Sequence, residues 1–261
     1  MGCVVAGRLR SVPRTLGLDG LVQRVRAAVV AQFRRPTGKF GKTAGLVMAF
    51  RRSNRKRNRW AVEHLALRDG DRVLELGCGP GVGVRFALQA GAGEVLALDH
   101  SIEMIRQADW RNRPAVADGR VVFRLGGLET LRHDDGPLDA AFMVNVVHFL
   151  PDRLHAFDMI GELLGEGGRL VVVYQPRMRK VGDDELLGGA EDLAAEMRET
   201  GFVDVACHRL ELSPNPALCV VGHVGAAGPR ASDRTAARRM PIAPKPARPA
   251  LRLVSGGAPA E

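Results

Sequence analysis

A glycine-rich segment follows a short apolar run that holds a single acid, Glu75. Its glycines stand at positions 77, 79, 81 and 83. Glycine lets the backbone bend sharply and approach a ligand closely. If a helix begins where this segment ends, its free N–H groups can hold a carboxylate or a phosphate. The segment therefore predicts a ligand site built largely from backbone.

A second acid, Asp99, ends the next apolar run. An acid here lies at the sheet edge beside the glycine segment, where a carboxylate can accept hydrogen bonds from the hydroxyls of a ribose. The alternative is that Asp99 caps the helix that begins near Ser101. Because Ser101 can cap that helix itself, we favour the ligand role for Asp99.

The glycine spacing argues against a dinucleotide site, whose fingerprint is G-x-G-x-x-G. Counting from residue 77 or from residue 79, the third glycine would fall on Val82 or on Val84, and Pro80 fits that fingerprint poorly. A short-chain reductase also needs a tyrosine with a lysine four residues later. The only tyrosine is Tyr174, and Met178 stands four residues beyond it. An NAD(P)-dependent Rossmann oxidoreductase is therefore the weaker alternative.

Five short β-branched runs alternate with helical patterns and would position these residues. The predicted strands are residues 72–76, 94–98, 121–125, 138–144 and 169–174, and the helices between them are 83–90, 102–111 and 152–164. Such alternation predicts a parallel sheet with helices on both faces. Right-handed crossovers then bring the carboxyl ends of the strands to one edge, where ligands bind.

The end of this region predicts a change in strand direction. A helix at 190–200 precedes two strands at 204–210 and 217–223, which are separated by the turn cluster Ser213-Pro214-Asn215-Pro216. The two strands are too close in sequence for a crossover helix, so they should pair antiparallel. The expected fold is a doubly wound, mostly parallel, seven-stranded α/β sheet that ends in an antiparallel hairpin.

The segment Glu75-Leu76-Gly77-Cys78-Gly79-Pro80-Gly81, with Leu98-Asp99-His100-Ser101-Ile102-Glu103-Met104 downstream, resembles the first two cofactor motifs of class I S-adenosylmethionine-dependent methyltransferases. The similarity covers about residues 54–223 and implies a Rossmann-like methyltransferase fold with S-adenosyl-L-methionine as the cofactor. By this resemblance Glu75 helps to position the methionine part, Asp99 holds the ribose, and His100 packs near the adenine. The residues of the loop that would contact the cofactor are Gly77, Cys78, Gly79 and Gly81.

One position departs from the family pattern. Members often carry a Gly-Asp pair after the third strand, and that Asp contacts the adenine amino group. Here Gly127 takes the place of the Asp, in the run Gly126-Gly127-Leu128-Glu129. The resemblance then leaves backbone groups of Gly127 and Leu128 to contact the adenine edge, and it leaves open whether Glu129 reaches it.

Methyl transfer needs the nucleophile in line with the S–CH3 bond, so positioning supplies much of the acceleration. Asn145 follows the fourth strand, at a place that in the family lies near the methyl group or the methionine amine. His148 is the candidate general base, because it titrates near neutral pH. The alternative for His148 is a packing role or a role at the start of a helix. We therefore predict Asn145 and His148 as the catalytic residues and Asn145 also as a cofactor contact.

The net charge of +9 is unevenly distributed along the 261 residues. Residues 1–70 carry +13, residues 71–225 carry −9 and residues 226–261 carry +5. We predict a basic N-terminal extension with lid helices at 1–53, a methyltransferase domain at 54–224 and a disordered Ala/Pro/Arg-rich tail at 225–261. In the N-terminal flank, Arg55, Asn58 and Arg59 are expected either to contact an anionic acceptor or the cofactor carboxylate, or to form a solvated helix face.

We expect a small-molecule methyl acceptor, since aromatic residues for base stacking make up only 5%. The alternative is an RNA methyltransferase that uses the basic flanks. The four cysteines show no paired spacing and predict neither a disulfide framework nor a metal site, as in a cytoplasmic protein. No apolar run is long enough for a membrane span. The pattern leaves the oligomeric state open.

Overall fold

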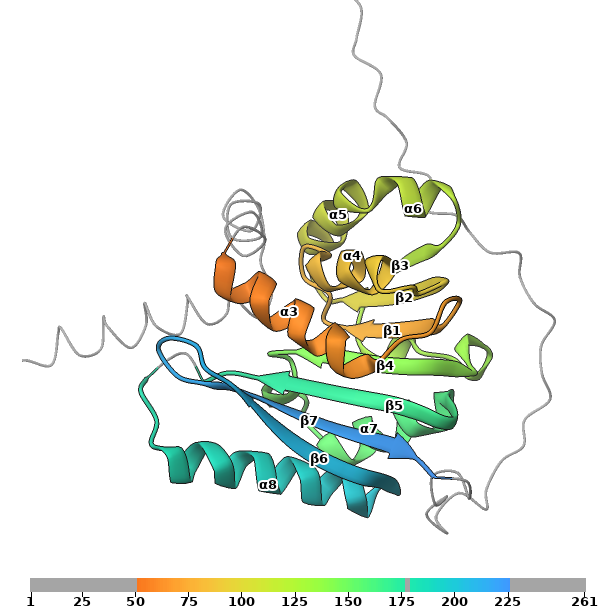
Figure 1. Cartoon of the computed structure of the whole chain (residues 1–261). Coiled ribbons are helices and arrows are strands. Elements are labelled where there is room, and N and C mark those ends of the chain that lie inside the picture. Colours follow the sequence, from red (N-terminus) through yellow and green to blue (C-terminus); the bar gives the residue numbers. More distant parts are fainter. Residues whose placement is uncertain (1–50, 177–178, 226–261) are drawn as a thin grey trace, which may run out of the picture. The chain divides into compact units, whose positions relative to one another are not determined.

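The computed structural model describes residues 51–176 and 179–225, which belong to one compact unit. The first 50 residues of the predicted extension, and all of the predicted tail beyond Gly225, lie outside the described residues. In the described part, seven strands form one sheet (Figure 1). The strands are β1 (Arg72–Leu76), β2 (Glu94–Asp99), β3 (Val121–Leu125), β4 (Leu138–Val144), β5 (Leu164–Tyr174), β6 (Phe202–Leu210) and β7 (Ala217–Val224).

The strand order is β3-β2-β1-β4-β5-β7-β6. The five strands from β3 to β5 pair in parallel, and β7 pairs antiparallel with both β5 and β6. The order reverses between β1 and β4, so the carboxyl ends of these two strands form the switch point where a doubly wound sheet binds its ligand. The predicted fold class, including the antiparallel hairpin at its end, is confirmed.

Helices cover both faces of the sheet (Figure 1). They are α3 (Arg52–Leu65), α4 (Val82–Gln89), α5 (Ile102–Arg111), α6 (Arg113–Ala117), α7 (Arg153–Leu163) and α8 (Asp183–Glu199), with the 3-10 turns η1 (Leu128–Thr130), η2 (His133–Asp135) and η3 (Val147–Phe149). Successive side chains of a strand point to opposite faces. In β1, Val73 packs with α3 and α4, while Leu74 and Leu76 pack with α7 and α8. Glu75, between the two leucines, therefore points toward α3 and α4.

Three predicted elements begin too late: the helix α8, the strand β5 and, by two residues, the strand β6, which starts at Phe202. Helix α8 starts at Asp183, before the predicted residue 190, because three acidic residues favour its first turn and the pair Gly188-Gly189 does not break it. A Cβ at Gly189 would lie 2.7 Å from the hydroxyl of Tyr174, so this glycine lets the helix approach the sheet. Strand β5 starts at Leu164, which pairs with Leu138, and the preceding helix ends one residue earlier.

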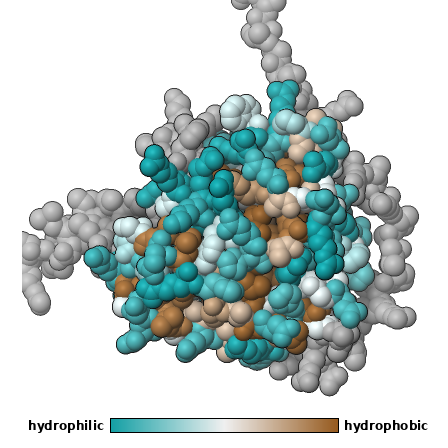
Figure 2. Space-filling model, in the orientation of Figure 1, coloured by the Kyte–Doolittle hydropathy of each residue, from teal (hydrophilic) through white to brown (hydrophobic). Residues whose placement is uncertain are grey.

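The surface of the described part carries both hydrophobic and hydrophilic residues. On the face seen in Figure 2, hydrophobic residues lie in separate patches among hydrophilic ones. None of the helices in the described ranges is long and apolar enough to cross a membrane.

Candidate active site

The glycine loop between β1 and α4 depends on a left-handed backbone. Gly77, Gly79 and Gly81 have φ angles of +71°, +51° and +74°, which side chains with a Cβ rarely adopt. A Cβ at Gly77 would collide with the side chain of Val146, and one at Gly81 would lie 2.8 Å from Ala108. At Gly79, by contrast, a Cβ would meet no described atom within 4 Å. The loop is thus packed at both ends and open in its middle.

A cleft lies beside this loop at the switch point of the sheet. Its walls come from α3, the loop, the start of α4 and the end of β4, through Asn54, Asn58, Gly77, Cys78, Gly79, Pro80, Val82 and Val144. Three of the four predicted loop contacts therefore line one cavity, and the fourth, Gly81, is the N-cap residue of α4.

Asp99 is tied to the loop through the backbone. Its Oδ2 accepts a hydrogen bond from the N–H of Gly79 at 2.8 Å, and its Oδ1 accepts one from the N–H of Ser101 at 2.8 Å. Ser101 caps α5 with its own hydroxyl, which accepts from the N–H of Met104. A carboxylate has about four acceptor positions, so Asp99 keeps capacity for further donors. Burial raises its pKa, against the lowering effect of the two N–H donors.

Glu75 lies beneath the loop and is almost fully buried, with 2% of its surface exposed. Its carboxylate accepts from the backbone N–H of Val84 in the first turn of α4, while Oε2 has no hydrogen-bond partner among the described residues. Burial raises the pKa of Glu75 well above its usual value, and the charge of Asp99 adds to the rise. An unpartnered buried oxygen is costly, and Oε2 of Glu75 keeps the capacity to accept a further donor.

Cys78 shares this acidic environment. Its thiol is buried, and its pKa is raised by burial and by the charges of Asp99 and Glu75. A thiol in such surroundings stays neutral and packs as a small apolar group. Two carboxyl groups therefore lie against the loop, Asp99 through the N–H of Gly79 and Glu75 beneath it.

The segment after β3 fills the place of the missing family aspartate. A Cβ at Gly127 would lie 2.7 Å from Nε2 of His100 and 2.8 Å from Oε2 of Glu129. The other oxygen of Glu129 accepts a hydrogen bond from the N–H of Gly127 at 2.7 Å, which lowers the pKa of Glu129. The structure thus brings His100, Gly127 and Glu129 together. Leu128 follows as the first residue of η1 and is half-buried.

Asn145 joins the ends of two strands. Its φ of 58° is left-handed, which asparagine tolerates better than most residues. Its N–H donates to the carbonyl of Val173 at 2.7 Å, and its side-chain Oδ1 accepts from the N–H of Gln175 at 2.8 Å. Asn145 follows Val144, which lines the cleft, so it fixes the backbone at the cleft wall.

His148 lies in η3 and is exposed, with its ring centroid 4.0 Å from that of Phe149. It does not line the cleft. Tyr174, at the end of β5, donates its hydroxyl to the carbonyl of Leu186 at 2.8 Å, and burial raises its pKa to about 12. Tyr174 is therefore a poor general base, and a base role for His148 would require the side chain to turn toward the cleft.

The structure adds a buried polar network that sequence reasoning missed. Arg57 is 1% exposed and donates to Oε1 of Gln175 and to Oδ1 of Asn54. Gln175 in turn donates to the carbonyl of Asn215 in the turn between β6 and β7. The signal was available in the helical spacing, since Asn54, Arg57 and Asn58 lie on the same face as the buried residues Ala61, Val62 and Leu65.

Fold and site together define a class: a doubly wound sheet ending in a hairpin, with an open glycine loop after β1 and an acid at the end of β2 bonded to it. Residues 73–168 match the family model described as "Methyltransferase domain". The chain therefore contains a methyltransferase domain, and its fold is that of the class I S-adenosylmethionine-dependent methyltransferases.

Relatives and solved structures agree with this family. The chain is 30% identical over 152 residues to a 27-O-demethylrifamycin SV methyltransferase of Amycolatopsis mediterranei, a match that covers 53% of this chain and 56% of that protein. It is 25% identical to the uncharacterized methyltransferase YdaC of Bacillus subtilis, over 67% of this chain and 94% of YdaC. Magnesium protoporphyrin IX methyltransferase from Synechocystis, solved with bound S-adenosylhomocysteine, has a similar fold, with a TM-score of 0.52 and 19% identity over 65% of this chain and 82% of that one. The chain thus spans about half the length of the rifamycin enzyme.

Proposed function

We propose that this protein transfers the methyl group of S-adenosylmethionine to a small-molecule acceptor. The observation that carries the proposal is the open glycine loop with two carboxyl groups packed against it: Asp99 is bonded to Gly79, and Glu75 lies beneath the loop with an unpartnered oxygen. S-adenosylmethionine supplies an electrophilic methyl group on a positively charged sulfonium. It also brings hydroxyl and ammonium donors, which match the free acceptor positions of the two carboxylates.

The residues of the chain would divide the work by position. Asp99 would hold the ribose hydroxyls, and the backbone of Gly77, Cys78 and Gly79 would lie under the methionine part. Gly127 and Leu128 would contact the adenine edge, with His100 beside them. Asn145 would keep the ends of β4 and β5 together, so that the wall of the cleft does not widen. Orienting the acceptor against the methyl group is most of what a methyl displacement requires.

A small acceptor is supported by the named relative. The 27-O-demethylrifamycin SV methyltransferase acts on a small molecule by its name. In addition, residues 71–225 carry a net charge of −9, which disfavours a long contact with nucleic acid. The basic flanks that would favour RNA lie mostly outside the described residues.

The cofactor is tested by calorimetric titration of the full chain with S-adenosylhomocysteine and, separately, with NADH. We expect binding of the first and none of the second. The acceptor is then sought by incubating the protein with a labelled methyl donor and either a metabolite extract or total RNA. Label in RNA alone, or a chain that binds NADH but not S-adenosylhomocysteine, would contradict the proposal.

A further inference from the structure

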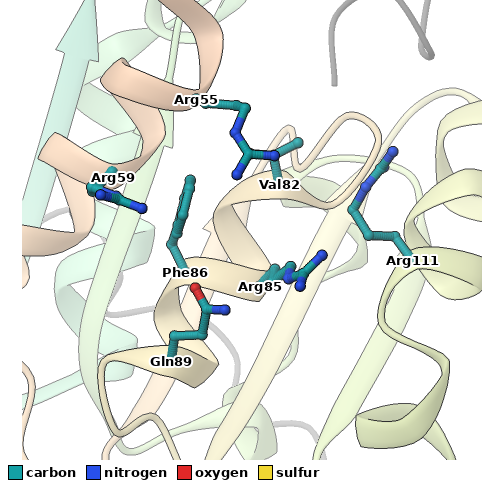
Figure 3. Close-up of a pocket in the computed structure, with 7 residues that line it drawn as sticks. All are labelled: Arg55, Arg59, Val82, Arg85, Phe86, Gln89 and Arg111. Carbon is teal, nitrogen blue, oxygen red and sulfur yellow. The ribbon is translucent and has the colours of Figure 1, made fainter. Parts of the chain in front are cut away.

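Four arginines line a second cavity, a groove outside the cofactor cleft. Arg55 and Arg59 come from α3, Arg85 from α4 and Arg111 from the end of α5, and they lie around Phe86 (Figure 3). The other residues that line the groove are Val82 and Gln89. No acidic residue is part of its lining.

The positive charges of this groove are not balanced within the part of the chain that the structure describes. None of the four arginines forms an ion pair with a described residue. The guanidinium groups of Arg55 and Arg59 lie 5.8 Å and 5.1 Å from the centre of the Phe86 ring, which supplies only weak cation–π attraction. Partial burial and the charges of Arg85 and Arg55 lower the pKa of Arg111, so the groups repel one another.

We propose that this groove binds the phosphate group of a small phosphorylated ligand. Guanidinium groups bind phosphate through paired, charge-assisted hydrogen bonds, and groups from three helices can surround its oxygens on several sides. A single carboxylate is satisfied by one arginine, so four arginines indicate a ligand with more than one negative charge. S-adenosylmethionine carries no phosphate, so the groove serves another molecule.

The groove borders the cofactor loop. Val82 lines both the groove and the cofactor cleft, and Arg111 donates a hydrogen bond to the carbonyl of Pro80 inside the loop. A phosphate at Arg111 therefore lies one side chain away from the loop. Phosphate binding in the groove requires no methyl transfer. It can therefore be tested independently of the proposed function.

A nucleic acid is the less fitting occupant. The groove is one compact cavity, whereas a strand of RNA needs a basic surface that continues for several nucleotides. Residues 71–225, which supply two of the three helices, have a net charge of −9. A strand that left the groove across this part of the chain would meet a surface with more acid than base.

The test is calorimetric titration of the full chain with sodium pyrophosphate at about 150 mM salt, where exposed charges are largely screened. The double variant Arg55→Gln/Arg59→Gln should weaken binding about tenfold or more, because it removes two charge-assisted contacts. The matched control is Arg52→Gln/Lys56→Gln, which removes two charges from the exposed side of the same helix outside the groove. We expect less than about a twofold change in that control.

A second variant, Arg85→Gln on α4, should weaken pyrophosphate binding by about fivefold. Because this residue lies on another helix, the loss would show that the effect is not confined to α3. All variants should keep the thermal midpoint of the wild type and its affinity for S-adenosylhomocysteine. No binding of pyrophosphate by the wild-type chain, or equal weakening in both double variants, would overturn the proposal. A single-stranded RNA that binds more tightly than pyrophosphate, with several ions released on binding, would also overturn it in favour of a nucleic acid.

Discussion

The carboxylate of Asp99 and the backbone N–H of Gly79 are joined by a hydrogen bond of 2.8 Å. The bond connects the end of β2 to the middle of the glycine loop, where the backbone is left-handed and no described atom would meet a Cβ. The backbone N–H of Gly79 in the loop therefore donates to the same side chain that is expected to hold the ribose. A change at Asp99 alters the ligand contact and the loop together.

We predict that Asp99→Asn lowers the affinity for S-adenosylhomocysteine by about tenfold or more, because the amide group replaces one of two charged acceptors with a donor. Calorimetric titration measures the loss. Ser101→Ala is the control: it removes the cap of α5 at a cost of about 1 kcal/mol in unfolding free energy but leaves the affinity unchanged. Equal affinity losses in both variants would show that Asp99 acts only on the fold.

Placing the aspartate of the family pattern at residue 127 should lower both cofactor affinity and stability. In Gly127→Asp the new Cβ would lie 2.7 Å from the ring of His100 and 2.8 Å from Glu129, so both side chains must move and a second carboxylate must approach the first. We expect weaker binding of S-adenosylhomocysteine and a lower melting temperature. The double variant Gly127→Asp/Glu129→Gln should recover part of both losses. Tighter binding of S-adenosylhomocysteine by Gly127→Asp would contradict this prediction and show that an aspartate fits at residue 127.

The raised pKa of Glu75 predicts that the stability of the fold depends on pH. Its pKa is raised by burial in the folded state, so the stability it contributes is fully present below the unfolded pKa and is lost as the pH rises through the folded pKa. The glutamine of Glu75→Gln cannot titrate. The unfolding free energy of this variant should therefore rise relative to that of the wild type as the pH increases from about 4 to about 8. Urea unfolding at several pH values measures the difference, with the exposed Glu63→Gln as the control for removal of one charge.

The same Glu75→Gln variant should bind S-adenosylmethionine more weakly, since the unpartnered oxygen would no longer face the ligand as part of a carboxylate. Greater stability at neutral pH together with lower affinity is the pattern of a group retained for binding. A variant that gains stability and binds the cofactor normally would place Glu75 outside the site.

We predict two alternatives for His148: the side chain acts as the general base in turnover, or it has no role in the reaction. His148→Ala should lower the rate with the acceptor by about a hundredfold if the imidazole removes a proton, with little change in cofactor affinity. Because the side chain is exposed and outside the cleft, an unchanged rate would assign it to packing against Phe149.

The buried network at Arg57 should control stability. Gln175→Ala removes an acceptor from a guanidinium that is 1% exposed and should lower the unfolding free energy by about 3 kcal/mol. Gln89→Ala, at an exposed position of α4, should change it by less than about 0.5 kcal/mol. Urea unfolding distinguishes the two. A small loss in Gln175→Ala would mean that another group compensates the charge of Arg57.

The sequence by itself determined the sheet, its hairpin and the glycine loop, because each is encoded by local signals. Strand periodicity and the glycines at 77, 79 and 81 each act within a few residues of the chain, and Asp99 is marked by its place at the end of the next strand. The start of α8 was misjudged for the same reason: Gly188-Gly189 looks like a break locally, and only the contact with Tyr174 explains it.

Tertiary structure alone decided which distant side chains meet. The occupation of the Gly127 position by His100 and Glu129, the burial of Arg57 against Gln175 and the gathering of four arginines around Phe86 each join separate elements of the chain. Their energies depend on distance and on exclusion of water, and neither quantity exists until the helices pack on the sheet.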